Sequence, residues 1–159
     1  MVDARFEDGA EQPLRLMAES AEDLTILSAL VQDSVFTGAD LRYSRKERRL
    51  DLLLNRFRWE DADRAAREGR SPERARAVLT IRDITRLGRQ GIEPSDAQAI
   101  LSLLSLGFEP GEDGTGALLL TLAGDGAIRA EVECLNLQLI DVTRPYAAPS
   151  GKVPSHPQD

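Results

Sequence analysis

The sequence has few of the side chains on which catalytic sites depend. It contains one cysteine, Cys134, and one histidine, His156. A single cysteine excludes an internal disulfide and a zinc site built from thiolates. His156 lies in a proline-rich end segment, where little would hold a catalytic base in place. Cys134 falls in the inward phase of a predicted strand, so we expect a buried core thiol. These absences favour a protein that is not an enzyme and that has no metal site and no cofactor.

Long apolar runs are also missing. No stretch has the length needed to cross a membrane. Residues 1–9 are acidic and lack the apolar segment of a signal peptide, so we expect a cytoplasmic protein without membrane association. Aromatic residues are scarce, so a core must come mainly from leucine, valine, isoleucine and alanine. A chain of 159 residues is long enough for one domain with such a core.

The clearest local pattern lies between residues 116 and 142. Two apolar runs flank Gly124-Asp125-Gly126, which predicts a hairpin because glycine accepts the positive φ that tight turns need. After the turn, Ile128 and Val132 alternate with charged residues, as on a half-buried strand. The alternation slips by one residue near Cys134-Leu135. We therefore predict one long strand with a β-bulge there, or with a bend that carries it to another sheet surface.

The rest of the chain predicts one helix and further short strands. Ser20 precedes a run with apolar residues at helical spacing and acidic residues in its first turn, which predicts a helix over 20–34. Strands are expected at 14–18, 39–43, 50–59 and 77–87, the last with a bulge between Ile81 and Ile84. Residues 95–109 fit a helix begun by Ser95-Asp96 or a strand from Ala99, and the turn that follows favours the strand.

Together these elements predict an α+β fold. We expect a curved antiparallel sheet or open barrel of about seven strands, with the one main helix (20–34) packed on it. The expected organisation is a flexible arm at 1–13, a single domain at 14–142 and a proline-rich extended tail at 143–159. Within the domain, residues 60–75 form a charged insertion that we expect to be partly helical or disordered.

The strongest chemical feature is the distribution of charge. Residues 42–91 carry fifteen basic and eight acidic side chains, while the remainder carries five basic and nineteen acidic ones. Almost all the basic residues are arginines, which bind carboxylates and phosphates with two parallel hydrogen bonds. The candidate binding residues are Arg45, Lys46, Arg48, Arg49, Arg56, Arg58 and Trp59. The alternative is that Trp59 belongs to the core and that the arginines pair with the many acids of the chain.

Two stretches resemble a known family. They are Lys46-Glu-Arg-Arg49 running into Leu54-Asn-Arg-Phe-Arg-Trp-Glu60, and Ala127-Ile-Arg-Ala-Glu-Val-Glu-Cys-Leu135 with Asp141, Pro145 and Tyr146 beyond it. Together they resemble an uncharacterised bacterial family catalogued as a domain of unknown function, DUF2948. The resemblance covers most of residues 14–157 and implies a cytoplasmic bacterial protein. It implies no activity, cofactor or catalytic residue.

Three functions follow from these patterns. The first is a non-catalytic adaptor or regulatory domain that binds a protein partner through an arginine-rich face. The second is an RNA-associated protein that uses the same face, with an exposed Trp59 for stacking. The third is a small metal-dependent hydrolase that uses Glu131, Glu133 and Asp141. A leucine-rich sheet with both faces apolar also allows a homodimer.

Overall fold

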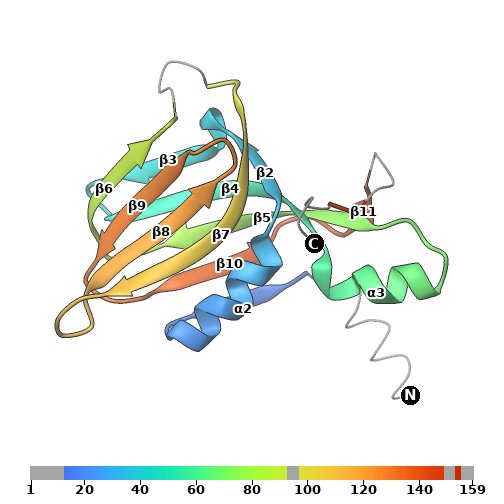
Figure 1. Cartoon of the computed structure of the whole chain (residues 1–159), viewed down its shortest axis with the longest axis horizontal. Helices are drawn as coiled ribbons and strands as arrows, with labels where there is room; N and C mark the ends of the chain where they lie inside the picture. The colour runs from blue at the N-terminus through green and yellow to red at the C-terminus, as the bar shows by residue number, and fades with distance from the viewer. Residues whose placement is uncertain (1–12, 93–96, 149–152, 155–159) are drawn as a thin grey trace.

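One large antiparallel sheet and two α-helices make up the fold, seen in a computed structural model that describes residues 13–92, 97–148 and 153–154 (Figure 1). The elements are β1 (Arg15–Ala18), α2 (Ala21–Val31), β2 (Ser34–Thr37), the 3-10 turn η1 (Gly38–Asp40), β3 (Leu41–Ser44), β4 (Arg49–Phe57), α3 (Trp59–Arg67), β5 (Glu73–Ile81), β6 (Ile84–Gln90), β7 (Ile100–Pro110), β8 (Gly116–Leu122), β9 (Ala127–Val132), β10 (Leu137–Asp141) and β11 (Tyr146–Ala147).

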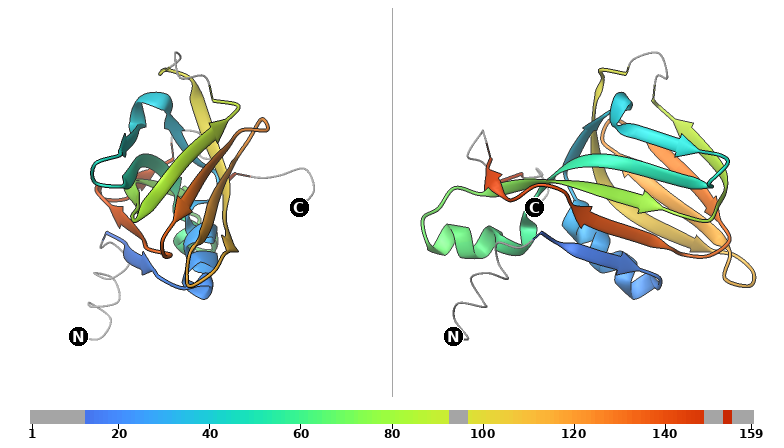
Figure 2. Two further views of the ribbon diagram at one scale, coloured as in Figure 1. Left: turned by 90° about the vertical axis from the view of Figure 1, so that its left-hand side faces the viewer. Right: turned by 180° about the vertical axis from the view of Figure 1, so that it is seen from behind.

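The sheet follows the order β1-β10-β5-β4-β2-β7-β8-β9-β6, with β3 paired to β4 and β11 paired to β5. It curves into a barrel-like wall that does not close, since its path ends at β1 and β6 (Figures 1 and 2). The curvature comes from two bends in the chain. Asp83, with a positive φ of 59°, separates β5 from β6, and residues 133–136 separate β9 from β10.

The inner face of the wall holds the core. Strand β4 alternates strictly, so Leu50, Leu52 and Leu54 are fully buried while the residues between them are partly exposed. Leucines, isoleucines and alanines of β5, β7, β8, β9 and β10 complete the same cluster. Each buried leucine contributes about 2 kcal/mol through removal of its surface from water. This burial holds both halves of the curved sheet together.

Helix α2 packs against the sheet with Leu24, Leu27 and Val31. It begins where the sequence predicts, because the Ser20 Oγ accepts a hydrogen bond from the Asp23 backbone N–H at 3.2 Å. It ends at Val31, earlier than predicted, and residues 34–37 form strand β2 instead. Asp33 makes this sharp reversal possible by adopting a positive φ of 63°.

The predicted α+β class and antiparallel sheet are confirmed, but the predicted number of elements is too low. The structure has eleven strands and two α-helices among the described residues, where about seven strands and one helix are expected. The range 77–87 is two strands, β5 and β6, and the strand beyond Cys134 is a separate strand, β10. The ambiguous range after Ala99 is strand β7. The charged insertion begins with helix α3, which projects beside the barrel (Figure 1).

Two predicted segments lie largely outside the described residues. They are the arm, of which only Pro13 is described, and most of the tail. The described part of the tail contains β11, which pairs with the start of β5 through Tyr146 opposite Arg74. No helix in the described ranges is long and apolar enough to cross a membrane.

Candidate functional site

The predicted arginine residues lie at the two ends of strand β4. Arg49 begins this strand and Arg56 is its second-last residue. At about 3.3 Å per residue, roughly 23 Å of strand separates them. The turn residues Arg45, Lys46 and Arg48 therefore form one group, and Arg56 with Arg58 forms another. The two groups therefore have different surroundings.

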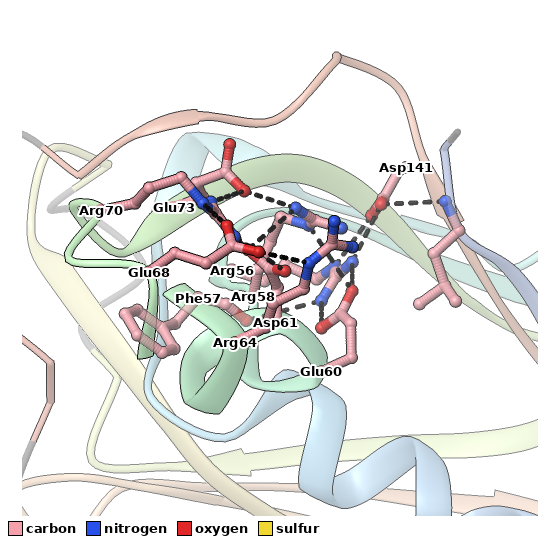
Figure 3. A network of polar contacts seen from close by, with 11 residues as sticks. Arg56, Phe57, Arg58, Glu60, Asp61, Arg64, Glu68, Arg70, Glu73 and Asp141 are labelled. Atoms are coloured by element: carbon pink, nitrogen blue, oxygen red, sulfur yellow. Dashed lines mark hydrogen bonds and ion pairs between the residues drawn. The ribbon is translucent and has the colours of Figure 1, made fainter. Parts of the chain in front are cut away.

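Arg56 lies in a buried ion-pair network (Figure 3). Its side chain has no exposed surface, and its Nε and Nη2 donate to the two carboxylate oxygens of Asp141 at 2.8 and 2.9 Å. Its Nη1 and Nη2 also donate to Glu60, at 2.9 and 2.7 Å. Burial alone would lower the pKa of Arg56, but the hydrogen bonds that it donates to Asp141 and Glu60 outweigh this effect and raise the pKa. Arg56 is therefore a permanently charged, buried side chain that links β4 to α3 and β10.

Arg58 and Trp59 are engaged next to this network. Arg58 Nη1 donates to Glu73 at 2.6 Å, and its side chain is only 8% exposed. The indole N–H of Trp59 donates to the Gln32 carbonyl oxygen at 2.8 Å, at the end of α2. The ring of Trp59 packs on Phe57 with centroids 4.6 Å apart. Trp59 is partly buried, so its ring does not form a free stacking platform.

At the other end of β4, Arg48 binds acids of the two chain bends and Arg49 binds acids close to it in the sequence. Arg48 binds Glu133 with two hydrogen bonds of 2.7 and 3.1 Å, and its Nη2 lies 3.6 Å from Asp83. Arg49 Nε donates to Asp51 at 3.0 Å. The hydrogen bonds from Arg48 lower the pKa of Glu133. The pairs of Arg48 join the β3–β4 turn to the points where the chain passes from one half of the sheet to the other.

Five exposed basic residues lie on β3, on the turn after it and on β6, and within the described ranges none of them makes an ion pair. We call this group the basic edge; its members are Arg42, Arg45, Lys46, Arg86 and Arg89. Arg42 lies on β3, Arg45 and Lys46 on the turn that follows it, and Arg86 and Arg89 on β6. The structure thus brings together two of the predicted site residues, Arg45 and Lys46, with three arginines outside the predicted set. The alternation of Arg42 with Leu41 and Tyr43 is a sequence signal for the first of these.

The family of the chain can be stated from its sequence. The profile of a family described as "Protein of unknown function (DUF2948)" matches residues 14–156. The chain belongs to this family. The match starts at the first strand and continues past β11, so it covers every element of the DUF2948 fold described above. A search of curated proteins gives no match, and a search of solved structures gives none either.

The acidic residues proposed for metal chemistry do not converge in this DUF2948 domain. Glu133 binds Arg48 at the chain bend, whereas Asp141 binds Arg56 in the buried network. Glu131 lies on β9 opposite Arg86 of β6. Among the described residues, no group of three histidine, cysteine or carboxylate side chains could hold a metal ion.

The prediction of a buried thiol at Cys134 is wrong. Cys134 is exposed, because it lies in the irregular segment between β9 and β10 rather than in a strand. Its Sγ donates to Asp83 Oδ2 at 3.3 Å. This hydrogen bond and partial burial raise the pKa of the thiol, which makes it a weaker nucleophile at neutral pH. His156 lies outside the described residues.

Proposed function

We propose that this DUF2948 domain is a non-catalytic binding module, an adaptor or regulatory domain of the bacterial cytoplasm, and that it holds a protein partner through the basic edge. The observation that supports this most is the contrast between two sets of arginines. Arg48, Arg49, Arg56 and Arg58 have acidic partners within the fold, whereas the five members of the basic edge make no ion pair in the described structure. The basic edge is therefore a group of arginine and lysine side chains that are exposed and available to a partner.

Exposed arginines of this kind recognise carboxylates well. A guanidinium can form two parallel hydrogen bonds with one carboxylate, and several arginines on neighbouring strands give such contacts a fixed geometry. The charge also speeds association with an acidic partner and makes binding sensitive to salt. Neither property requires catalytic residues, and the rigid curved sheet supplies the support.

Nucleic acid is the competing ligand, because phosphates also attract arginines. The position of Trp59 counts against it. This aromatic residue packs on Phe57 and binds the end of α2, at the opposite end of β4 from the basic edge. A single strand of nucleic acid bound at the basic edge would therefore lack Trp59, the stacking partner that the sequence suggests.

The test is an affinity pull-down from native bacterial lysate, with and without nuclease. The test variant carries Arg42→Glu, Arg45→Glu and Lys46→Glu. The matched control carries the same change at Arg67, Arg76 and Arg144, which are exposed and lie on α3, on β5 and beyond β10. We expect a protein partner that survives nuclease, is lost with the test variant and is kept with the control. Equal recovery with both variants would contradict the proposal, and material recovered only without nuclease would favour nucleic acid.

A further inference from the structure

Strand β6 has one unpaired edge. The residues of β6 pair with β9 only. Strand β9 lies beside β6 and β10 lies beside β5, with Ile84 opposite Val132 and Ile81 opposite Leu137. The segment β9–β10 therefore follows one side of the bent segment β5–β6 along its whole length. Strand β4 lies along the other side of β5. The unpaired side of β6 is therefore the side on which β4 and its hairpin partner β3 lie. Consistent with this, the Ile84 N–H donates to the Arg48 carbonyl oxygen at 3.0 Å.

Strand β3 also has an unpaired edge. It pairs with β4 only, from Leu41 opposite Leu52 to Ser44 opposite Arg49. In the described structure no backbone pairing joins β3 to β6, and the left view of Figure 2 shows both strands facing the reader with no strand between them. The sheet is thus open along a line that has a free strand edge on each side.

The side chains along this line alternate in character. Leu87 of β6 lies opposite Ala130, and Tyr43 of β3 lies opposite Leu50, so both point to the core side and pack on it. On the outer face, Arg86 and Arg42 are exposed. An extended segment placed here would have one face against apolar side chains and the other beside arginines.

We propose that the partner of the proposed binding role is an extended acidic polypeptide segment that adds as a strand to the free edge of β6, on the side facing β3. Recognition by strand addition takes affinity from backbone hydrogen bonds and specificity from alternate side chains. Here the favoured sequence alternates apolar residues, directed to Leu87 and Tyr43, with glutamate or aspartate, directed to Arg86 and Arg42. This inference rests on the proposed function, so its test distinguishes a failure of strand addition from a failure of the proposed binding role.

A second copy of the chain is a poor occupant of this edge. Pairing two β6 strands would bring Arg86 and Arg89 of one copy beside those of the other, and like charges on paired strands are destabilising. Charged side chains on an edge strand also discourage edge-to-edge aggregation. The carboxylates of an acidic segment would instead be attracted to these arginines.

The test uses a fluorescent ten-residue peptide of alternating glutamate and valine, titrated against the full chain by fluorescence anisotropy. We expect saturable binding that weakens at least about tenfold with Arg86→Glu plus Arg89→Glu and is unchanged with Arg67→Glu plus Arg76→Glu. Thermal unfolding of each variant verifies its fold. Amide hydrogen exchange should show new protection within 85–90 when the peptide binds.

Backbone hydrogen bonding is tested with two further peptides, each N-methylated at one of the two alternating sets of residues. Each of these peptides keeps its charge, but its backbone cannot donate hydrogen bonds along one of its two edges. At least one of them should therefore bind at least about tenfold more weakly than the parent peptide. If both bind like the parent peptide, strand addition is overturned while binding of an acidic partner stands. If no peptide binds but the pull-down partner still depends on the basic edge, only this inference fails. If a twenty-residue thymidine oligonucleotide binds in place of the peptide and depends on the same arginines, both proposals fail in favour of nucleic acid.

Discussion

At the scale of single residues, Arg56 connects more of the fold than any of its neighbours. Its partner Asp141 is 2% exposed and also accepts a hydrogen bond from the Leu14 backbone N–H at 3.0 Å. Its other partner, Glu60, lies in the first turn of α3. One guanidinium thus joins a central strand, a helix and the segment leading into β1. A buried charge with this many partners is costly to leave uncompensated.

Replacing Arg56 with methionine should therefore destabilise the protein strongly. The substitution leaves Asp141 buried without its cationic partner, and we expect a loss of about 3–5 kcal/mol in the free energy of unfolding. Urea denaturation measures it. The control is Arg64→Met, which breaks the exposed pair with Glu68 and should cost less than about 1 kcal/mol. Similar losses for the two variants would show that the buried network adds no special stability.

The thiol of Cys134 gives a second test at this scale. Because its hydrogen bond to Asp83 raises its pKa, we expect it to react with a disulfide reagent at pH 7.5 more slowly than an unperturbed cysteine of a short peptide. Asp83→Asn removes the negative charge, keeps a residue type that tolerates the positive φ and should speed the reaction. A rate that does not change in this variant would contradict the assigned cause.

At the scale of elements, the β7–β8 hairpin depends on a close approach at Gly116. A Cβ at this position would lie 2.5 Å from the Glu109 carbonyl oxygen and would also overlap the ring of Phe108. Gly107, on the facing strand, has open space around its α-carbon. The same change from glycine to alanine therefore has opposite consequences at two positions of one hairpin.

We expect Gly116→Ala to lower the free energy of unfolding by about 1–3 kcal/mol, because backbone as well as side chain must shift to admit the methyl group. Gly107→Ala should be neutral or raise stability by up to about 1 kcal/mol, because alanine restricts the unfolded chain. Thermal or urea unfolding of both variants, measured side by side, tests this. Equal effects would mean that the hairpin relaxes freely at Gly116.

Elements with a strong local signal could be predicted from the sequence. The Gly124–Gly126 turn, the start of α2 at Ser20 and the change of phase near Cys134 all depend on neighbouring residues, and the structure contains each of them. Strand β2 has only four residues directly after a helix, so no period can be seen in it. The separation of β5 from β6 depends on one residue, Asp83, in an unusual conformation.

The site was harder to predict because its contacts are distant in the sequence. Arg56 and its partner Asp141 are 85 positions apart, so the clustering of arginines along the chain could not reveal which of them are buried. The basic edge depends on two strands, β3 and β6, that have no backbone pairing with each other in the described structure. Composition identified the charge, but only the sheet order separates available arginines from those already paired.

At the scale of the whole molecule, ion pairs join the places where the chain changes direction. Asp83 and Glu133 at the two bends bind Arg48 of the β3–β4 turn, and Asn136 donates a further hydrogen bond to Asp83 at 3.2 Å. Asp61 binds Arg70 and so ties α3 to the segment that returns to β5. The molecule is acidic overall, yet its carboxylates stabilise the fold where arginines meet them.

This arrangement predicts a fold that loses stability in acid. The hydrogen bonds from Asn136 and Cys134 lower the pKa of Asp83, and Arg48 lowers that of Glu133. Burial would raise the pKa of Asp61, but its hydrogen bond with Arg70 prevails and lowers it. A carboxylate whose pKa is lower in the folded than in the unfolded state stabilises the fold fully above its unfolded pKa of about 4. That contribution is lost as the pH falls from about 5 through the folded pKa values.

Urea denaturation at pH 7, 5, 4 and 3 should therefore give nearly equal free energies of unfolding at pH 7 and 5 and a progressive decrease below pH 5. Asp83→Asn should start from a lower stability at pH 7, because the charge that attracts Arg48 is gone, and should decrease less steeply in acid. Glu112→Gln, in the exposed β7–β8 turn, is the control and should follow the wild type at every pH. If Asp83→Asn shows the same acid dependence as the wild type, the carboxylate of Asp83 does not contribute to the pH dependence of folding, and this prediction is wrong.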